Sequence, residues 1–116
     1  MPGGWTQQNV DSQDIKELSS RAMKSVNQQM NDIHYWIPIK ILKAESHVVA
    51  GTEYRLEILA AQADCLKNQI SAADFDAANC AEKEGGAKKI FTVNVWSKPW
   101  EDNFEKVTVT AQKAVE

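Results

Sequence analysis

The chain has 116 residues, the length of one domain with a single hydrophobic core. Its 13 basic and 16 acidic residues give a net charge of −3, which excludes the strongly basic surface of a nucleic-acid-binding protein. The 43% of hydrophobic residues include no run long enough to span a bilayer, so we expect neither a nucleic-acid nor a membrane partner.

Residues 1–10 contain the pair Gly3-Gly4 and have no hydrophobic periodicity, so we predict a flexible arm. The arm has neither the basic start nor the apolar core of a signal peptide, which favours a mature chain with an added initiator Met. From Asp11 or Ser12 to Met30, apolar residues recur every three or four positions. Because Asp and Ser are both good N-caps, we predict one long amphipathic helix that packs on a flat surface.

After residue 32 the hydrophobic period changes to two. Isoleucine occupies every second position over 37–41, which predicts a strand with one buried face, and Pro38 within it should lie at an edge or a bulge. A second alternating run over 54–60 begins just beyond Gly51. We therefore expect residues 47–51 to form a hairpin turn between two antiparallel strands.

Residues 62–88 are polar with little periodicity, which predicts an appended surface segment with a short helix over 71–78. Strand alternation resumes over 91–95, breaks at 99–103, and returns over 107–111 as a second hairpin. One helix followed by alternating strands predicts an α+β fold. We expect a single domain in which one long N-terminal helix packs across a four- to five-stranded antiparallel β-sheet.

The two cysteines, Cys65 and Cys80, lie fifteen positions apart within the polar segment. This spacing suits a loop-closing disulfide better than a metal motif. Such a bridge would add about 3 kcal/mol of stability and would indicate an oxidising compartment. The alternative is a pair of free buried thiols in a cytosolic protein.

Catalytic constellations are missing from the sequence. His34 and His47 together with the cysteines would supply the parts of a nucleophilic site, but the histidines belong to a strand and a turn rather than to the polar segment. The same residues lack the paired short spacings of a zinc site. The glycines at 85–86 precede a strand and not the helix of a phosphate loop. We expect no enzyme activity, no metal and no cofactor.

Three stretches instead contain residues that are unusual for a solvent-exposed surface without a binding partner. They are Gly3 and Gly4 in the arm, His47, Val48, Val49, Ala50 and Gly51 in the first turn, and Pro99 and Trp100 in the second. Glycines allow close backbone approach, valines are unusual in a hairpin turn, and tryptophan is a common interface anchor. In a helix-then-meander sheet the three stretches share one end, where they would form a narrow edge suited to a concave cleft. The alternatives are a turn that folds back on the core and a tryptophan that lies across the sheet.

In order and spacing these motifs resemble the cystatin family of protease inhibitors over nearly all 116 residues. The family pattern is an N-terminal Gly, then Gln-x-Val-x-Gly, then Pro-Trp. Cys65 and Cys80 match the first disulfide of the secreted, type 2 cystatins, and Gly3-Gly4-Trp5 resembles the secreted cystatins of parasitic nematodes. His47 replaces the family Gln, and Phe91 stands where secreted relatives carry a Cys, so the second disulfide is absent.

The resemblance implies tight, reversible inhibition of papain-like cysteine proteases of the cathepsin class. The arm at Gly3, the turn at 47–51 and Pro99-Trp100 would form a wedge that blocks the active-site cleft without being cleaved. Some secreted relatives also inhibit legumain through an Asn-Asp pair after the helix, and Asn31 and Asp32 occupy that place. The alternative is that Asn31 simply ends the helix in a left-handed conformation.

We expect a secreted, extracellular monomer. A domain-swapped dimer is the alternative, because a β-branched Val49 strained in the turn would relax if the hairpin opened and exchanged with a second chain. A different class of function is an immune-modulating binding protein that acts through surface outside the wedge. For that role the surface segment at 62–89 is the candidate.

Overall fold

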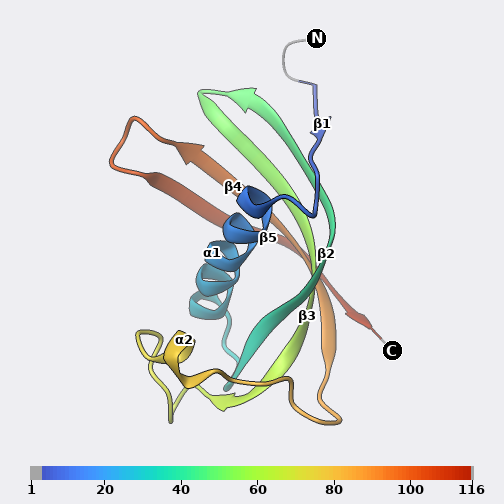
Figure 1. Ribbon diagram of the computed structural model, residues 1–116, viewed down its shortest axis with the longest axis vertical. Helices are drawn as coiled ribbons and strands as arrows, with labels where there is room; N and C mark the ends of the chain where they lie inside the picture. Colours follow the sequence, from blue (N-terminus) through green and yellow to red (C-terminus); the bar gives the residue numbers. More distant parts are fainter. Residues whose placement is uncertain (1–3, 116) are drawn as a thin grey trace.

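The computed structural model describes residues 4–115, which form a helix packed on one antiparallel sheet (Figure 1). The elements in chain order are β1 (Thr6–Gln7), α1 (Gln13–Gln29), β2 (His34–Val49), β3 (Gly51–Leu66), α2 (Phe75–Ala78), β4 (Lys88–Lys98) and β5 (Phe104–Val115). The five strands pair in sequence order, each antiparallel to the next. The predicted α+β fold is confirmed. The arm is not irregular throughout, because two of its residues pair with β2 as β1.

Helix α1 has a defined start and end. Ser12 is its N-cap, and the Ser12 Oγ accepts a hydrogen bond from the Ile15 backbone N–H at 3.3 Å. The helix ends where Met30 becomes extended. Lys67 Nζ donates to the carbonyl oxygens of Asn27 at 2.6 Å and Met30 at 3.1 Å, so a cation satisfies the negative end of the helix dipole.

The core lies between α1 and one face of the sheet. Its aromatic centre is Trp36 of β2 and Phe91 of β4, whose rings meet edge to face with centroids 5.7 Å apart. The remaining buried residues of this cluster are Ile15, Leu18, Ala22, Met23, Val26, Ala44, Leu56, Ile58, Ala60, Val93 and Val95. Phe91 is therefore a core residue with no exposed surface.

Strand β2 is irregular, and this irregularity overturns one prediction. Its register against β3 shifts between Pro38 and Lys40 and again between Ile41 and Lys43. Each shift adds a residue and reverses the alternation of faces. As a result Ile39 is 43% exposed, and the expected buried face at every second residue is wrong there. Pro38 lies beside the first bulge on an edge of the sheet that β1 does not reach, as predicted.

The polar segment begins later than predicted, because β3 continues through Leu66. Its helix, α2, is also shorter than the predicted 71–78 and spans Phe75–Ala78. Cys65 and Cys80 are joined in a disulfide with their Cα atoms 5.7 Å apart, so the alternative of free thiols is wrong. No helix in the part of the chain that the structure describes is long and apolar enough to cross a membrane.

Asn27 joins the helix to the sheet and should be a strong determinant of stability. Its side chain donates to the Trp36 carbonyl at 2.9 Å and accepts from the Trp36 N–H at 2.8 Å, and Asn27 is only 6% exposed. Asn27→Ala leaves both buried backbone groups of Trp36 without these partners. We expect a loss of about 2 kcal/mol in the free energy of unfolding, measured by urea denaturation. Gln28→Ala, on the exposed neighbour, should change it by less than about 0.5 kcal/mol; equal effects would contradict this assignment.

Candidate functional site

Three segments converge at one end of the sheet (Figure 1). β1 pairs Thr6 with Ser46, which places the preceding arm residues beside the end of β2. The β2–β3 and β4–β5 hairpin turns point toward this same end, opposite the disulfide loop. Gly4 is exposed here, whereas Gly3 lies outside the described residues.

The first hairpin is tighter than predicted. β2 runs to Val49 and β3 begins at Gly51, so the turn itself is at Ala50 and not the whole of 47–51. Val48 is 75% exposed and Val49 is 40% exposed. The alternative in which the apolar turn folds back on the core is therefore wrong, and two branched apolar side chains stand at the tip.

Gly51 is required by this turn for two independent reasons. Its φ is +96°, a conformation that residues with a side chain rarely adopt. A Cβ at position 51 would also lie 2.2 Å from the Ser97 carbonyl oxygen on β4. Within residues 47–51, all of which are described, Gly51 alone has a positive φ, so the predicted strain at Val49 is not found.

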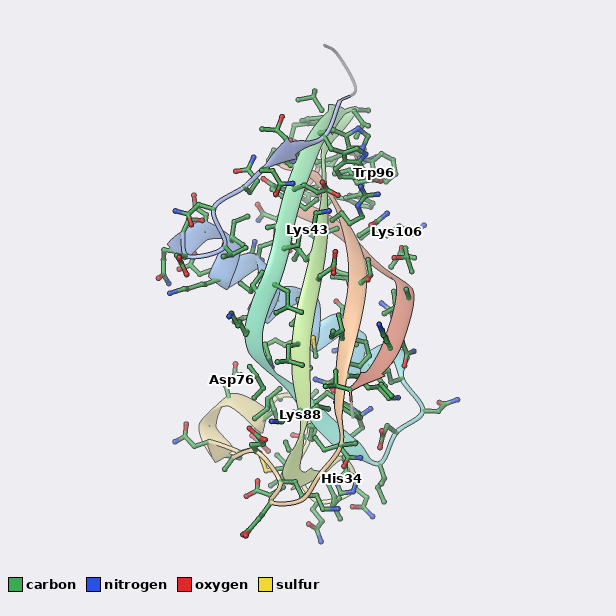
Figure 2. All side chains as sticks on the ribbon, turned by 90° about the vertical axis from the view of Figure 1, so that its right-hand side faces the viewer. His34, Lys43, Asp76, Lys88, Trp96 and Lys106 are labelled. Atoms are coloured by element: carbon green, nitrogen blue, oxygen red, sulfur yellow. A yellow bond between two sulfur atoms is a disulfide. The ribbon has the colours of Figure 1, made fainter. Side chains whose placement is uncertain are left out.

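Trp96, which the sequence analysis leaves without a role, ties the two hairpins together. Its indole Nε1 donates to the Ala50 carbonyl oxygen at 2.7 Å, across from β4 to the tip of the first hairpin. The Trp96 ring meets Phe104 edge to face at 5.7 Å. Lys98 Nζ lies 4.3 Å from the Trp96 centroid. Figure 2 shows Trp96 at the hairpin end of the molecule.

The second hairpin turn displays Trp100. This side chain is 65% exposed, so the alternative in which it lies across the sheet is wrong. The turn closes through Asp102 and Asn103, whose φ values are +47° and +57°, a region that short polar residues tolerate. Pro99 precedes Trp100 where β4 has ended. Trp100 and the two valines of the first turn thus form an exposed apolar edge, which we name the hairpin edge.

His47 is not at the hairpin edge but beside it. Its ring centroid lies 3.9 Å from that of Trp5 in the arm, and its Nε2 lies 3.0 Å from Glu53 Oε1. Arg55 of β3 stands over the same Trp5 ring, with its guanidinium carbon 4.2 Å from the centroid. Trp5 therefore contacts two strands, β2 and β3.

Asn31 and Asp32 directly precede β2, whose first residue, His34, lies at the end of the molecule opposite Trp96 in Figure 2. Partial burial alone would raise the pKa of Asp32. It is outweighed by hydrogen bonds from the His34 N–H and the Trp36 indole, each 2.9 Å, and by the positive charge of Lys67, so the pKa is lowered. Asn31 is exposed and does not have a positive φ, so the left-handed alternative is wrong.

Potential ligands for a metal ion lie together at one place in the described part of the chain. The group of potential ligands found there is Asp64 with Cys65 and Cys80. The two sulfurs already form the disulfide and are not thiolates that could bind an ion.

One helix packed on a five-stranded antiparallel sheet, with three chain segments at one end, defines the fold class of this protein. A family model described as "Cystatin domain" matches residues 3–100 of the chain. The chain therefore belongs to the cystatin family, which inhibits cysteine proteases. Its relatives are protease inhibitors and not enzymes.

The relatives include proteins from nematodes. Onchocystatin of Onchocerca volvulus is 38% identical over 97% of this chain and 68% of its own length. Cystatin cpi-2 of Brugia malayi is 35% identical over the same shares. The solved structure of Al-CPI superimposes with a TM-score of 0.84 at 36% identity, covering 97% of this chain and all of the other.

Gly51→Ala should disrupt the first hairpin more than backbone strain alone predicts. Gly85→Ala is the matched control, because Gly85 also has a positive φ of +69° but nothing lies within 4 Å of the added Cβ. We expect about 1 kcal/mol of destabilisation for Gly85→Ala and about 3 kcal/mol or more for Gly51→Ala, which adds the clash with Ser97. Thermal unfolding followed by circular dichroism measures both, and a similar loss for the two variants would contradict the close packing of Gly51.

Proposed function

We propose that this protein is a tight, reversible inhibitor of papain-like cysteine proteases of the cathepsin class. The arm with Gly3 and Gly4 and the hairpin edge enter the active-site cleft as a three-part wedge. His47, Val48, Val49, Ala50 and Gly51 contribute the first turn, and Pro99 and Trp100 the second. The observation that carries the proposal is the convergence of exposed Val48, Val49 and Trp100 at one end of a rigid sheet.

The mechanism is occlusion and not chemistry. The wedge fills the cleft on both sides of the protease cysteine, and none of its backbone is presented in a cleavable register. Little conformational entropy is lost on docking, because sheet pairing and the bond from Trp96 to Ala50 already fix the first turn. The exposed indole of Trp100 supplies a large apolar area that water leaves on binding.

Titration of papain with the protein tests the proposal. The rate of hydrolysis of a small peptide substrate reports the remaining protease activity. We expect stoichiometric and reversible loss of protease activity. Trp100→Ala removes the indole and Gly3→Glu blocks close backbone approach of the arm. Each should weaken inhibition by on the order of 2 kcal/mol, or about 30-fold in the inhibition constant.

The control is Leu42→Ala, which removes another exposed apolar side chain from β2, away from the hairpin edge. It should leave the inhibition constant within about twofold of wild type, as expected for a residue outside an interface. A wild-type protein that leaves papain fully active contradicts the proposed function. Unchanged inhibition by both Trp100→Ala and Gly3→Glu contradicts the wedge.

We further propose that the protein is secreted and acts outside the cell as a monomer. The disulfide between Cys65 and Cys80 supports an oxidising compartment. The monomer is supported by the first hairpin, since Gly51 and not Val49 has the positive φ of the turn, so opening of the hairpin would relieve no backbone strain at Val49.

We propose a second protease site, against legumain, at Asn31 and Asp32. Legumain cleaves after asparagine, and Asn31 is an exposed asparagine on the connection between α1 and β2. The following Asp32 is fixed by its two hydrogen bonds, which hold this connection in one conformation. This site faces away from the wedge, so both proteases would bind without competing.

Asn31→Lys should abolish legumain inhibition, because a lysine cannot occupy a pocket selective for asparagine. Papain inhibition by the same variant should stay within about twofold of wild type, since the wedge is at the other end of the sheet. Both are measured as inhibition constants on one preparation. If the Asn31→Lys variant still inhibits legumain, the proposal of a second site at Asn31 and Asp32 is contradicted.

A further inference from the structure

The arm is bound to β2 over three consecutive residues before it reaches its free end. Thr6 pairs with Ser46 and Gln7 with Glu45. Gln8 continues the attachment, because its backbone N–H donates to the Ala44 carbonyl at 2.8 Å and its side-chain amide donates to the Ser46 hydroxyl at 2.8 Å. The register thus brings the preceding residue, Trp5, level with His47.

Trp5 is held by side chains from two different strands. The His47 ring of β2 lies 3.9 Å from the indole centroid and is tilted by 31°. The guanidinium of Arg55 on β3 lies 4.2 Å from the same centroid, a cation–π distance. Trp5 is accordingly partly buried although it stands beside the exposed Gly4.

Both partners of Trp5 are themselves fixed by carboxylates. His47 Nε2 lies 3.0 Å from Glu53 Oε1 on the facing strand. Arg55 Nε donates to Glu45 Oε1 at 2.6 Å, and its NH2 group forms an ion pair with the same carboxylate. The Glu45 side chain is only 7% exposed, so the guanidinium is held by a nearly buried charge. The surface that receives Trp5 is therefore preformed on the sheet.

We propose that Trp5 is a positioning residue for inhibition: held by His47 and Arg55, it orders the arm residues against the first hairpin before a protease arrives. This rests on the proposed function. The conformational entropy of the arm is then lost when the inhibitor folds and not when it binds the protease, so this loss does not weaken the complex. His47, which replaces the family Gln, supplies the ring on which Trp5 stacks.

Two substitutions at position 5 separate ring stacking from the rest of the side chain. Trp5→Ala removes both aromatic contacts and should raise the inhibition constant for papain about tenfold, the size expected for one aromatic pair plus one exposed cation–π contact. Trp5→Phe keeps a ring between the same partners and should stay within about threefold of wild type. Circular dichroism at the assay temperature checks that both variants are folded.

A double-mutant cycle with Gly3→Glu distinguishes positioning from direct contact with the protease. If Trp5 acts by placing the arm, Trp5→Ala should change inhibition by less than about twofold once Gly3→Glu has disabled the arm. A tenfold loss that persists in the Gly3→Glu background overturns the proposal, because Trp5 then acts without the arm. No loss for Trp5→Ala in the otherwise wild-type chain also overturns it.

A measurement on the free protein keeps this inference separate from the proposed function. The {1H}–15N heteronuclear NOE of the Gly4 amide reports the order of the arm on the picosecond to nanosecond timescale. We expect it to fall in Trp5→Ala and to be retained in Trp5→Phe. An unchanged NOE in Trp5→Ala overturns the positioning role. Failure of the wild-type protein to inhibit papain contradicts the proposed function alone.

Discussion

The close approach of Gly51 to β4 is the constraint on which the hairpin edge depends. Gly51 and Thr52 start β3, and Thr52 is paired with Ser97 at the end of β4. A side chain at position 51 would collide with the Ser97 carbonyl, so the strands reach this distance only with glycine. The same approach brings the Ala50 carbonyl within 2.7 Å of the Trp96 indole. One backbone contact thereby fixes the first turn relative to the second hairpin.

The segments of the proposed wedge are therefore placed by the sheet and not by flexible loops. The arm is set by its pairing with Glu45 and Ser46, and the first turn by an uninterrupted ladder between β2 and β3 near the tip. The register shifts of β2 all lie between His34 and Lys43, away from this end. Regular pairing is concentrated where positions must be accurate for binding, which limits the entropy lost on association.

Local patterns in the sequence predict much of the fold. Ser12 and the three-and-four spacing after it predict the helix, and period-two runs predict both hairpins. Pro38 predicts an edge or a bulge, but the alternation of residues does not predict that Ile39 is exposed, because the effect of a bulge on the following residues depends on the register with the partner strand. The prediction of the surface segment failed at its start for a similar reason, since polar residues up to Leu66 remain in β3 through pairing.

Some features of the candidate site are likewise predicted by local sequence, and others depend on contacts between distant parts of the chain. The exposure of Trp100 follows from its place in a turn, and that of Val48 from its place at the tip of a hairpin, and both are local features. The roles of Trp5 and Trp96 do not follow from local features, because each makes its contacts with residues far along the chain, His47 and Ala50 respectively. The four tryptophans in the composition are the available signal, and composition predicts neither the position nor the partner of a side chain. Contacts of this kind become visible only when strand register is known.

Strand β2 runs the length of the molecule, from His34 at one end to Val49 at the other, and the longest extent of the fold is 45 Å. At the His34 end, Lys67 caps the helix and its charge also faces Asp32, so the helix terminus and the Asn31 connection are stabilised together. None of these groups contacts the residues that fix the first turn. Substitutions at such a distance, with no shared partner, are additive in free energy. Each end of this scaffold can therefore change its surface without altering the geometry of the other.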